Sequence, residues 1–168
     1  MLPNINHILY ATDLSGSARK VMEYAVALAD AFEASLSIIH VIKETSANAE
    51  LLMAAFLGYQ NKADLKQKSQ GQVTMEIKNR LRQICDELGC QLPACRFKLA
   101  EVIVEVGHPL DIILSQAKRG PYDILVIGRH DYRLIEGAIR GHSTRGLLRD
   151  CPIPVFLVPI SHRQEPDI

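Results

Sequence analysis

Short apolar runs alternate with segments of helical periodicity along this chain. The runs have the length of buried strands and lie at 8–11, 36–42, 102–106, 124–127 and 155–158. Between them, apolar residues recur every three or four positions, which is typical of helices that pack on a sheet. The resulting β-α-β-α-β-α-β-α-β order predicts an α/β fold, namely a doubly wound, five-stranded, mostly parallel sheet with helices on both faces.

Turn and cap residues set the predicted helix ends. The first helix follows Ser15, a preferred N-cap residue. A second long helix ends at Gly89, and Pro109 opens the next one because proline suits the first helical position. The predicted inner stripe of the first helix consists of Val21, Ala25, Leu28 and Phe32, with Tyr24 and Ala29 beside it.

Residues 43–71 interrupt this regular alternation. They are mostly polar, with one apolar island at 51–57. We expect an irregular insertion with one short helix that covers part of a helix layer, and a lid or a partner surface is the alternative. The sequence therefore predicts one domain over residues 1–160, with this insertion inside it and a tail at 161–168.

Composition then narrows the function classes. The chain has 168 residues, of which 48% are hydrophobic, enough to bury a single core. Its 19 basic and 19 acidic side chains balance, so no overall field draws it to nucleic acid or to an anionic membrane. No apolar run approaches the ~18 residues that span a bilayer. The N-terminus lacks the basic and apolar regions of a signal peptide, so we expect a cytoplasmic protein.

The four cysteines fit side-chain packing better than metal binding. Cys85, Cys90 and Cys95 are spaced too widely for a Cys-x-x-Cys zinc knuckle, and His108 is the only histidine close to them in sequence. In a protein without a secretory leader, we expect these residues and Cys151 to be reduced thiols. No metal site is predicted.

The main candidate chemistry follows the first and fourth predicted strands. In a doubly wound sheet, ligands bind at the carboxyl ends of the strands near the switch point. This rule brings Thr12 and Asp13 opposite Gly128 and Arg129. Asp13 has two interpretations that both stay open: a ligand contact, or a turn residue that bonds the backbone before Ser15.

Two glycines frame the segment after the fourth strand. Gly128 directly follows the apolar run, and Gly141 comes just before hydroxyl residues, so backbone N–H groups there could cradle an anion. Ser143 and Thr144 would then bond a phosphate. The alternative interpretation makes one of them the N-cap of the last helix.

Four segments of the chain resemble the universal stress protein family. They are Ile8 to Ser15, Ile39-His40-Val41, Val106-Gly107-His108-Pro109, and Asp123 to Val158. The family pattern in the last segment is Gly-x-x-Gly, nine residues, then Gly followed by Ser or Thr. Here it is Gly128-x-x-Asp131, nine residues, then Gly141-His142-Ser143. The spacing is kept, but Asp131 and His142 depart from the pattern.

The resemblance implies a fold, a site and a partner. The fold is an adenine-nucleotide alpha-hydrolase-like sheet of strand order 3-2-1-4-5, and the partner is a second copy paired through the last strand at 155–158. In the implied site, Asp13 lies beside the adenosine, the backbone of Val41 reads the adenine, and the glycine loop with its hydroxyls holds the phosphates. The implied cofactor-binding residues are Ala11, Thr12, Asp13, Val41, Ile127, Gly128, Asp131, Gly141, His142, Ser143 and Thr144.

Asp131 is the departure with the largest physical consequence. A carboxylate ~6 Å from one phosphate charge costs roughly 3 kcal/mol at an effective dielectric near 20. One charge-assisted N–H bond returns about 1.5–3 kcal/mol, so Asp131 cancels about one phosphate contact. An arginine on Asp131, or a divalent cation between it and the phosphates, would offset this cost. The family contains members that bind ATP and members that do not, and loss of this glycine is typical of the second group.

Motifs for catalysis are missing from the sequence. It has no Walker A loop, no Gly-x-Gly-x-x-Gly after the first strand and no Gly-x-Ser-x-Gly elbow, so we expect no enzyme, with slow ATP hydrolysis left open. The leading hypothesis is a stress-response protein that binds ATP or AMP weakly, with Mg²⁺ only alongside ATP. The alternative is a nucleotide-independent dimer that acts through protein partners not identified by the sequence.

Overall fold

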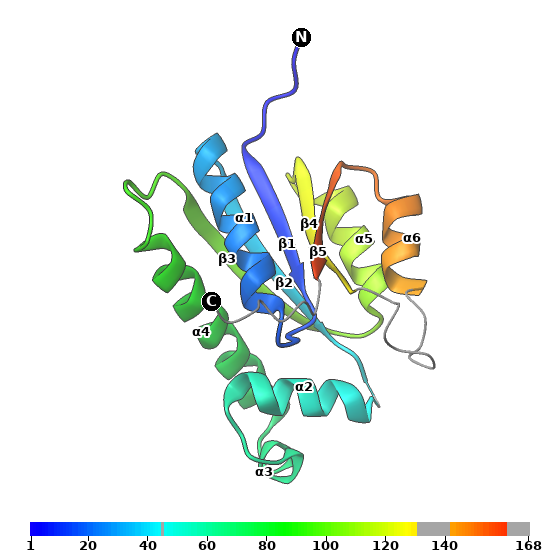
Figure 1. The fold of residues 1–168 in the computed structure, drawn as a ribbon. Coiled ribbons are helices and arrows are strands. Elements are labelled where there is room, and N and C mark those ends of the chain that lie inside the picture. Colours follow the sequence, from blue (N-terminus) through cyan, green and yellow to red (C-terminus); the bar gives the residue numbers. More distant parts are fainter. Residues whose placement is uncertain (45, 131–141, 161–168) are drawn as a thin grey trace, which may run out of the picture.

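Five parallel strands form one sheet in the order β3-β2-β1-β4-β5 (Figure 1). The computed structural model describes residues 1–44, 46–130 and 142–160. The strands are β1 His7–Thr12, β2 Ser35–Ile42, β3 Lys98–Val106, β4 Ile124–His130 and β5 Val155–Ile160. Each adjacent pair is parallel, which confirms the predicted fold class and strand order.

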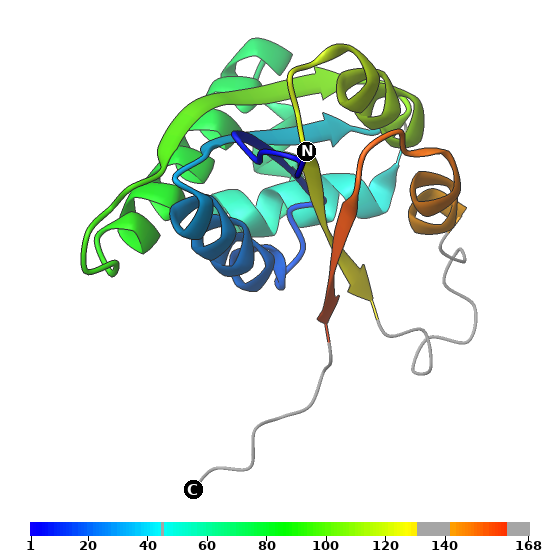
Figure 2. The same ribbon diagram turned by 90° about the horizontal axis from the view of Figure 1, so that it is seen from above.

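Helices cover both faces of this sheet. They are α1 Ala18–Phe32, α2 Ala47–Leu57, α3 Lys62–Lys66, α4 Gln70–Gly89, α5 Pro109–Arg119 and α6 His142–Asp150. Figure 2 shows α1 and α4 together on one side of the sheet, with α5 and α6 on the other. Among the described residues, no helix is long and apolar enough to cross a bilayer.

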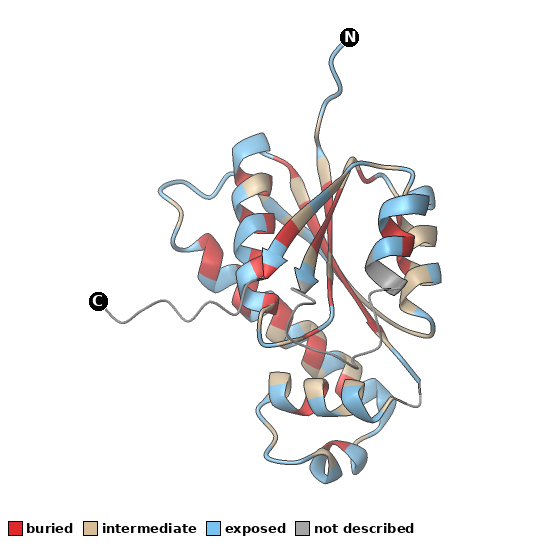
Figure 3. Ribbon diagram, turned by 45° about the vertical axis from the view of Figure 1, so that its right-hand side comes forward, coloured by how far each residue is buried: buried red, intermediate tan, exposed pale blue. Residues whose placement is uncertain are grey.

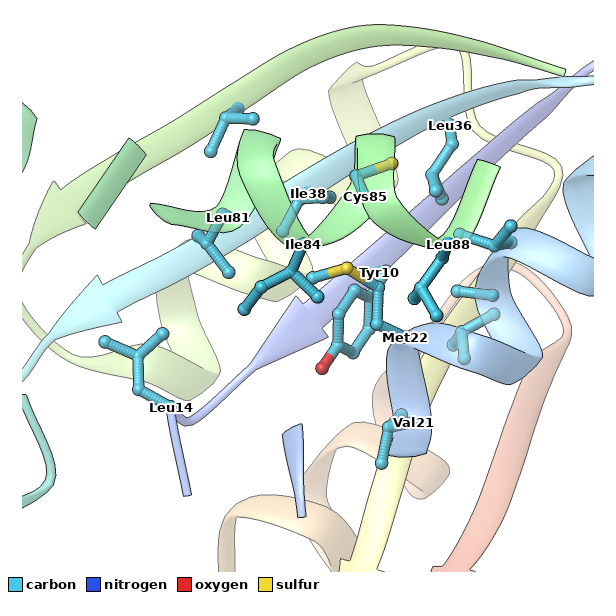
Figure 4. Close-up of a cluster of buried hydrophobic side chains, with 14 of the residues drawn as sticks. Tyr10, Leu14, Val21, Met22, Leu36, Ile38, Leu81, Ile84, Cys85 and Leu88 are labelled. Carbon is cyan, nitrogen blue, oxygen red and sulfur yellow. The ribbon is translucent and has the colours of Figure 1, made fainter. Parts of the chain in front are cut away.

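The alternation of side chains along the strands builds two hydrophobic clusters. Ile8 and Tyr10 of β1 pack with α1 and α4, whereas Leu9 between them packs with α5 and α6. Figure 4 shows Tyr10 surrounded by Met22, Ile84 and other side chains of the first cluster. Figure 3 shows that buried residues follow the strands and the helix surfaces turned toward them. Because β1 is buried on both faces, its backbone is a rigid base for the residues that follow it.

The predicted start of α1 was wrong, and its inner face was predicted in part: Val21, Ala25 and Ala29 are buried and Leu28 packs against the core, but Tyr24 and Phe32 do not. The helix begins at Ala18, with Ser17 rather than Ser15 as its N-cap residue, because the chain first makes a turn in which Ala18 N donates to Ser15 O. Its buried face includes Met22 and Val26, whereas the side chains of Tyr24 and Phe32 are 45% and 47% exposed. The helix is therefore rotated relative to the predicted stripe. Two aromatic side chains remain on its surface.

The insertion contains more helix than the sequence pattern indicated. α2 and α3 occupy most of it, and α4 begins at Gln70, inside the predicted range of 43–71. Side-chain caps begin all three helices: Ser46 accepts from Ala49 N, Asn61 accepts from Asp64 N, and Ser69 forms a capping box with Gln72. These local caps supply the helix starts that the weak apolar periodicity of the insertion did not reveal.

A polar cluster of Tyr59, Lys68 and Glu76 connects the insertion to α4. Glu76 of α4 accepts hydrogen bonds from Tyr59 OH, at 2.6 Å, and from Lys68 Nζ. Lys68 Nζ also lies over the Tyr59 ring, 5.0 Å from its centroid. Met53 and Leu65 are buried in the cluster under α1 and α4, so α2 and α3 extend this side of the core.

Candidate functional site

The strands β1 and β4 separate before either of them ends. They pair only at Ile8↔Ile124, Leu9↔Leu125 and Tyr10↔Val126. Beyond Tyr10, β1 stays paired with β2, and beyond Val126, β4 stays paired with β5. Figure 2 shows the β4–β5 pair running away from β2 and β3. The sheet thus opens at the carboxyl ends of β1 and β4, which is the switch point where ligands bind in doubly wound sheets.

The β1 side of this opening carries a tight turn. Leu14 N donates to Thr12 Oγ1 at 3.1 Å, and Ser15 N donates to Asp13 Oδ1 at 2.9 Å. Leu14 has a φ of 59°, in the left-handed region that leucine rarely adopts, and its side chain is buried. The turn bond expected of Asp13 is present, and the same side chain is exposed at the strand end. Asp13 can thus both shape the turn and face a ligand.

Val41 and His40 lie on the neighbouring strand. Val41 is buried against the α5 and α6 side, and its Cα partner in β3 is Glu105. His40 is also buried, and its Nδ1 lies 2.8 Å from Thr12 O. Burial lowers the pKa of His40, while the bond to Thr12 and the charge of Asp13 act in the opposite direction. The sequence interpretation used His40 only as part of the resemblance, although a polar residue inside an apolar run was a visible signal.

The β4 side differs from the prediction. β4 does not end at Ile127 but continues through Gly128 to His130, because pairing with β5 continues to Ile160. A Cβ on Gly128 would lie 2.7 Å from Ile160 Cδ1 and 2.9 Å from Val21 Cγ2. A side chain on Gly128 would therefore force Ile160 or Val21 to shift, so glycine suits the packing between α1 and β5 independently of any phosphate. Ile127 is buried on the opposite face, and Ala11 of β1 packs against the same cluster.

The remaining predicted residues lie partly outside the described chain. Asp131 and Gly141 fall in the range 131–141, which the structure does not describe. α6 already begins at His142, so the interpretation of Ser143 or Thr144 as its N-cap residue is wrong, and both stand in its first turn. N–H groups at a helix N-terminus lack helical partners and can bind an anion.

Two arginines of this part of the chain are in different environments. Arg129 is exposed at the end of β4. Arg149, on the last turn of α6, donates to both carboxylate oxygens of Asp150 at 2.8 Å. This pair lowers the pKa of Asp150 through the guanidinium hydrogen bonds. Arg149 is thus engaged locally with Asp150, at the end of α6 that leads to the start of β5, whereas Arg129 is exposed near the carboxyl end of β4.

The described cysteines and acidic side chains do not gather into a metal centre. Within residues 1–44, 46–130 and 142–160, no group of three or more His, Cys, Asp or Glu side chains could hold a metal ion. The four cysteines are free thiols, and burial raises the pKa of Cys85 to about 12. Cys85 is therefore a neutral packing residue of α4, in keeping with its place in the apolar cluster.

Comparison with known proteins agrees with this architecture. The sequence model of the universal stress protein family matches residues 4–159. The chain belongs to this family. No curated protein matches the sequence. As a universal stress protein, it has the α/β domain of that family over residues 4–159.

Several solved structures share the fold of this universal stress protein. UspA from Lactobacillus plantarum is 19% identical with a TM-score of 0.62, and the match covers 94% of this chain and 99% of that one. A universal stress protein in complex with cAMP is 19% identical with a TM-score of 0.62, covering 95% and 100%. A family protein from Arabidopsis thaliana with AMP bound is 17% identical with a TM-score of 0.59, covering 96% of each chain. At these identities the likeness establishes the fold alone.

Proposed function

We propose that this universal stress protein binds an adenine nucleotide, ATP or AMP, between the carboxyl ends of β1 and β4. The observation that carries the proposal is the separation of these strands after Tyr10 and Val126, which exposes the end of β1 at the switch point. Two structures of the same fold hold cAMP and AMP. A stress-response role accompanies family membership.

The β1-terminal turn fits a polar ligand. Asp13 is exposed there, and a carboxylate at this position suits the hydroxyls of a ribose. Two residues further, Ser15 Oγ is buried without a hydrogen-bond partner among the described residues. Buried hydroxyls in folded proteins are normally bonded, so an unpartnered one beside the strand end is consistent with a ligand or a water completing the site.

We expect the binding to be weak because of Asp131. Its carboxylate replaces the glycine that family members place near the phosphates, and one such charge offsets about one phosphate contact. AMP carries less charge than ATP and should suffer less from it. Mg²⁺ should improve the binding of ATP but not that of AMP, because a divalent cation between the Asp131 carboxylate and the phosphates of ATP reverses the local repulsion.

Titration calorimetry of the full chain with ATP, ADP, AMP and cAMP, each with and without Mg²⁺, tests this proposal. Binding of at least one nucleotide is expected, weakened by Asp13→Ala and unchanged by Asp111→Ala, which removes an exposed carboxylate at the start of α5. Absence of heat and of any thermal shift with all four ligands would refute nucleotide binding. An equal loss in both variants would show that the Asp13 carboxylate is not a specific contact of the nucleotide.

We also propose that the chain acts as a binding protein in the cytoplasm rather than as an enzyme. The described side chains near the strand ends include Asp13 but no described nucleophile paired with a base, which acyl or phosphoryl transfer by a protein nucleophile requires. The four free thiols suit a reducing compartment. Release of phosphate from ATP faster than in the Asp13→Ala variant would overturn the first point.

A second candidate function is that of a nucleotide-independent homodimer that acts through protein partners. β5 is an edge strand, and Phe156 on it is 38% exposed. The Tyr24 ring of α1 lies beside it, with ring centroids 6.3 Å apart and an interplanar angle of 37°. An edge strand flanked by exposed aromatic rings favours pairing with a second copy. Light scattering after size exclusion, with and without nucleotide, tests this: a dimer in both conditions supports it, and a monomer opposes it.

A further inference from the structure

A buried imidazole joins the ends of β1 and β2. His40 is 6% exposed and Thr12 is 8% exposed, and the two residues are Cα partners at the last rung of the β1–β2 ladder. His40 Nδ1 lies 2.8 Å from Thr12 O. A carbonyl oxygen only accepts hydrogen bonds, so Nδ1 must carry the hydrogen and donate it. The neutral ring then has its lone pair on Nε2.

This hydrogen bond is the first link of a short chain that ends at the candidate ligand residue. Thr12 receives the imidazole N–H at its carbonyl, and its Oγ1 accepts from Leu14 N at 3.1 Å. Leu14 is held at a φ of 59°, which an L-residue adopts only when its surroundings enforce it. Asp13 lies between these two anchored residues, and its Oδ1 closes the turn onto Ser15 N.

The hydrogen bond from His40 to Thr12 lies where β1 has a neighbouring strand on one side only. β1 has lost its β4 neighbour beyond Tyr10, so the strand end that bears Asp13 is supported from the β2 side. The imidazole attaches this end to β2, the strand that also contains Val41. The support from β2 is therefore important for the position of Asp13, because the β4 side of this strand end is open to a ligand.

We propose that His40 is a positioning residue of the nucleotide site, and that its Nδ1–H bond to Thr12 O holds the turn that presents Asp13. The inference rests on the proposed function for its ligand, but the ordering of the turn is a property of the free protein. Loss of the bond leaves a buried carbonyl without this donor, and we expect nucleotide affinity to fall about tenfold.

Two amide variants, His40→Asn and His40→Gln, distinguish a role of His40 in positioning the turn from a role in packing alone. In His40→Asn the amide nitrogen is at the δ position, about where Nδ1 stands, so it can still donate to Thr12 O. In His40→Gln the amide nitrogen is one bond further out and misses that position. Ile38→Val is the matched control, because it removes a buried methylene from the same face of β2 without touching the bond.

Hydrogen exchange of the amides of Leu14 and Ser15 is measured in the free proteins, together with calorimetric nucleotide affinity. We expect wild type, His40→Asn and Ile38→Val to agree, and His40→Gln to exchange about tenfold faster and bind about tenfold more weakly. Equal behaviour of the Asn and Gln variants would overturn the inference. If wild type binds no nucleotide, the proposed function fails, and the exchange rates alone decide the positioning role.

A measurement on the wild-type protein tests the inference even if the His40 variants do not fold. The ¹⁵N spectrum of the histidine rings distinguishes the two neutral tautomers. The geometry requires a hydrogen on Nδ1 of His40, and burial, which lowers the pKa of His40, favours the neutral ring with Nε2 unprotonated near neutral pH. Observation of the Nε2–H tautomer would exclude donation to Thr12 O and overturn the inference without any substitution.

Discussion

Gly128 of β4 and Ile160 of β5 approach so closely that a side chain on Gly128 would force its neighbours to shift. A Cβ on Gly128 would stand 2.7 Å from Ile160 Cδ1, inside van der Waals contact. The two residues lie at the end of the β4–β5 ladder, where Gly128 pairs with Val158 and His130 pairs with Ile160. A glycine that the family pattern associates with phosphate binding therefore also has a packing role in this chain.

Gly128→Ala should destabilise the fold even without nucleotide. Overpacking of a buried contact costs about 1–3 kcal/mol, and the added methyl group would also meet Val21 Cγ2 at 2.9 Å. Urea unfolding measures the loss. Ile160→Val removes Cδ1, so Gly128→Ala combined with Ile160→Val should lose less stability than the two single effects summed. Strict additivity of the two substitutions would contradict the close contact.

Asp131→Gly should strengthen ATP binding about tenfold or more. Removal of the carboxylate takes away a repulsion of roughly 3 kcal/mol with one phosphate charge at ~6 Å. Asp131 lies outside the described residues, so the prediction rests on the family spacing alone. Calorimetry with ATP and with adenosine distinguishes the charge effect, because adenosine carries no phosphate and its affinity should not change. Unchanged or weaker ATP binding would show that the charge argument is misplaced.

Because of His40, the free energy of unfolding should increase as pH rises through the slightly acidic range. Burial lowers its pKa in the folded state below the ordinary value of 6.5, so the unfolded chain binds the proton more readily. The stabilising contribution is complete above about pH 6.5, and it is lost as pH falls from there toward the lower folded pKa. One such group changes stability by at most about 1.4 kcal/mol per pH unit.

Urea unfolding at several pH values between 5 and 7.5 measures this dependence, roughly spanning the ordinary histidine pKa. His40→Asn lacks the titrating ring, so its profile should be flatter than that of wild type over the same range. Carboxylates that titrate near the acid end affect both proteins equally and cancel in the difference. Parallel profiles for the two proteins would contradict a buried, neutral His40.

The sequence was sufficient for the sheet but not for the details of the site. Five apolar runs separated by helical segments allow few other arrangements, because each parallel strand needs a crossover of this length. The end of β4 was misplaced because Gly128 has a low strand propensity, whereas pairing with β5 decides where the strand stops. That pairing is a long-range property with no local pattern.

Two other differences have the same physical origin. Tyr24 is apolar enough to fit a buried stripe, but the rotation of α1 places it beside Phe156, a contact between residues far apart in sequence. The bond from His40 to Thr12 requires the register in which these residues are partners. A polar residue in an apolar run marks the position, but only the ladder supplies its acceptor. Local patterns therefore located the strands, and tertiary pairing determined where β4 ends and which contacts the strand ends make.

Phe156→Lys should convert the proposed dimer into a monomer. β5 is an edge strand, and its exposed aromatic ring lies against Tyr24, so a charge at this position would be buried in any pairing of two β5 edges. Met75→Lys is the control, because Met75 is 55% exposed on α4, across the sheet order from β5 (Figure 1). Light scattering should give half the mass for Phe156→Lys and an unchanged mass for Met75→Lys. A dimer that survives Phe156→Lys would place the interface elsewhere, and nucleotide affinity measured on the resulting monomer would show whether the site needs the second copy.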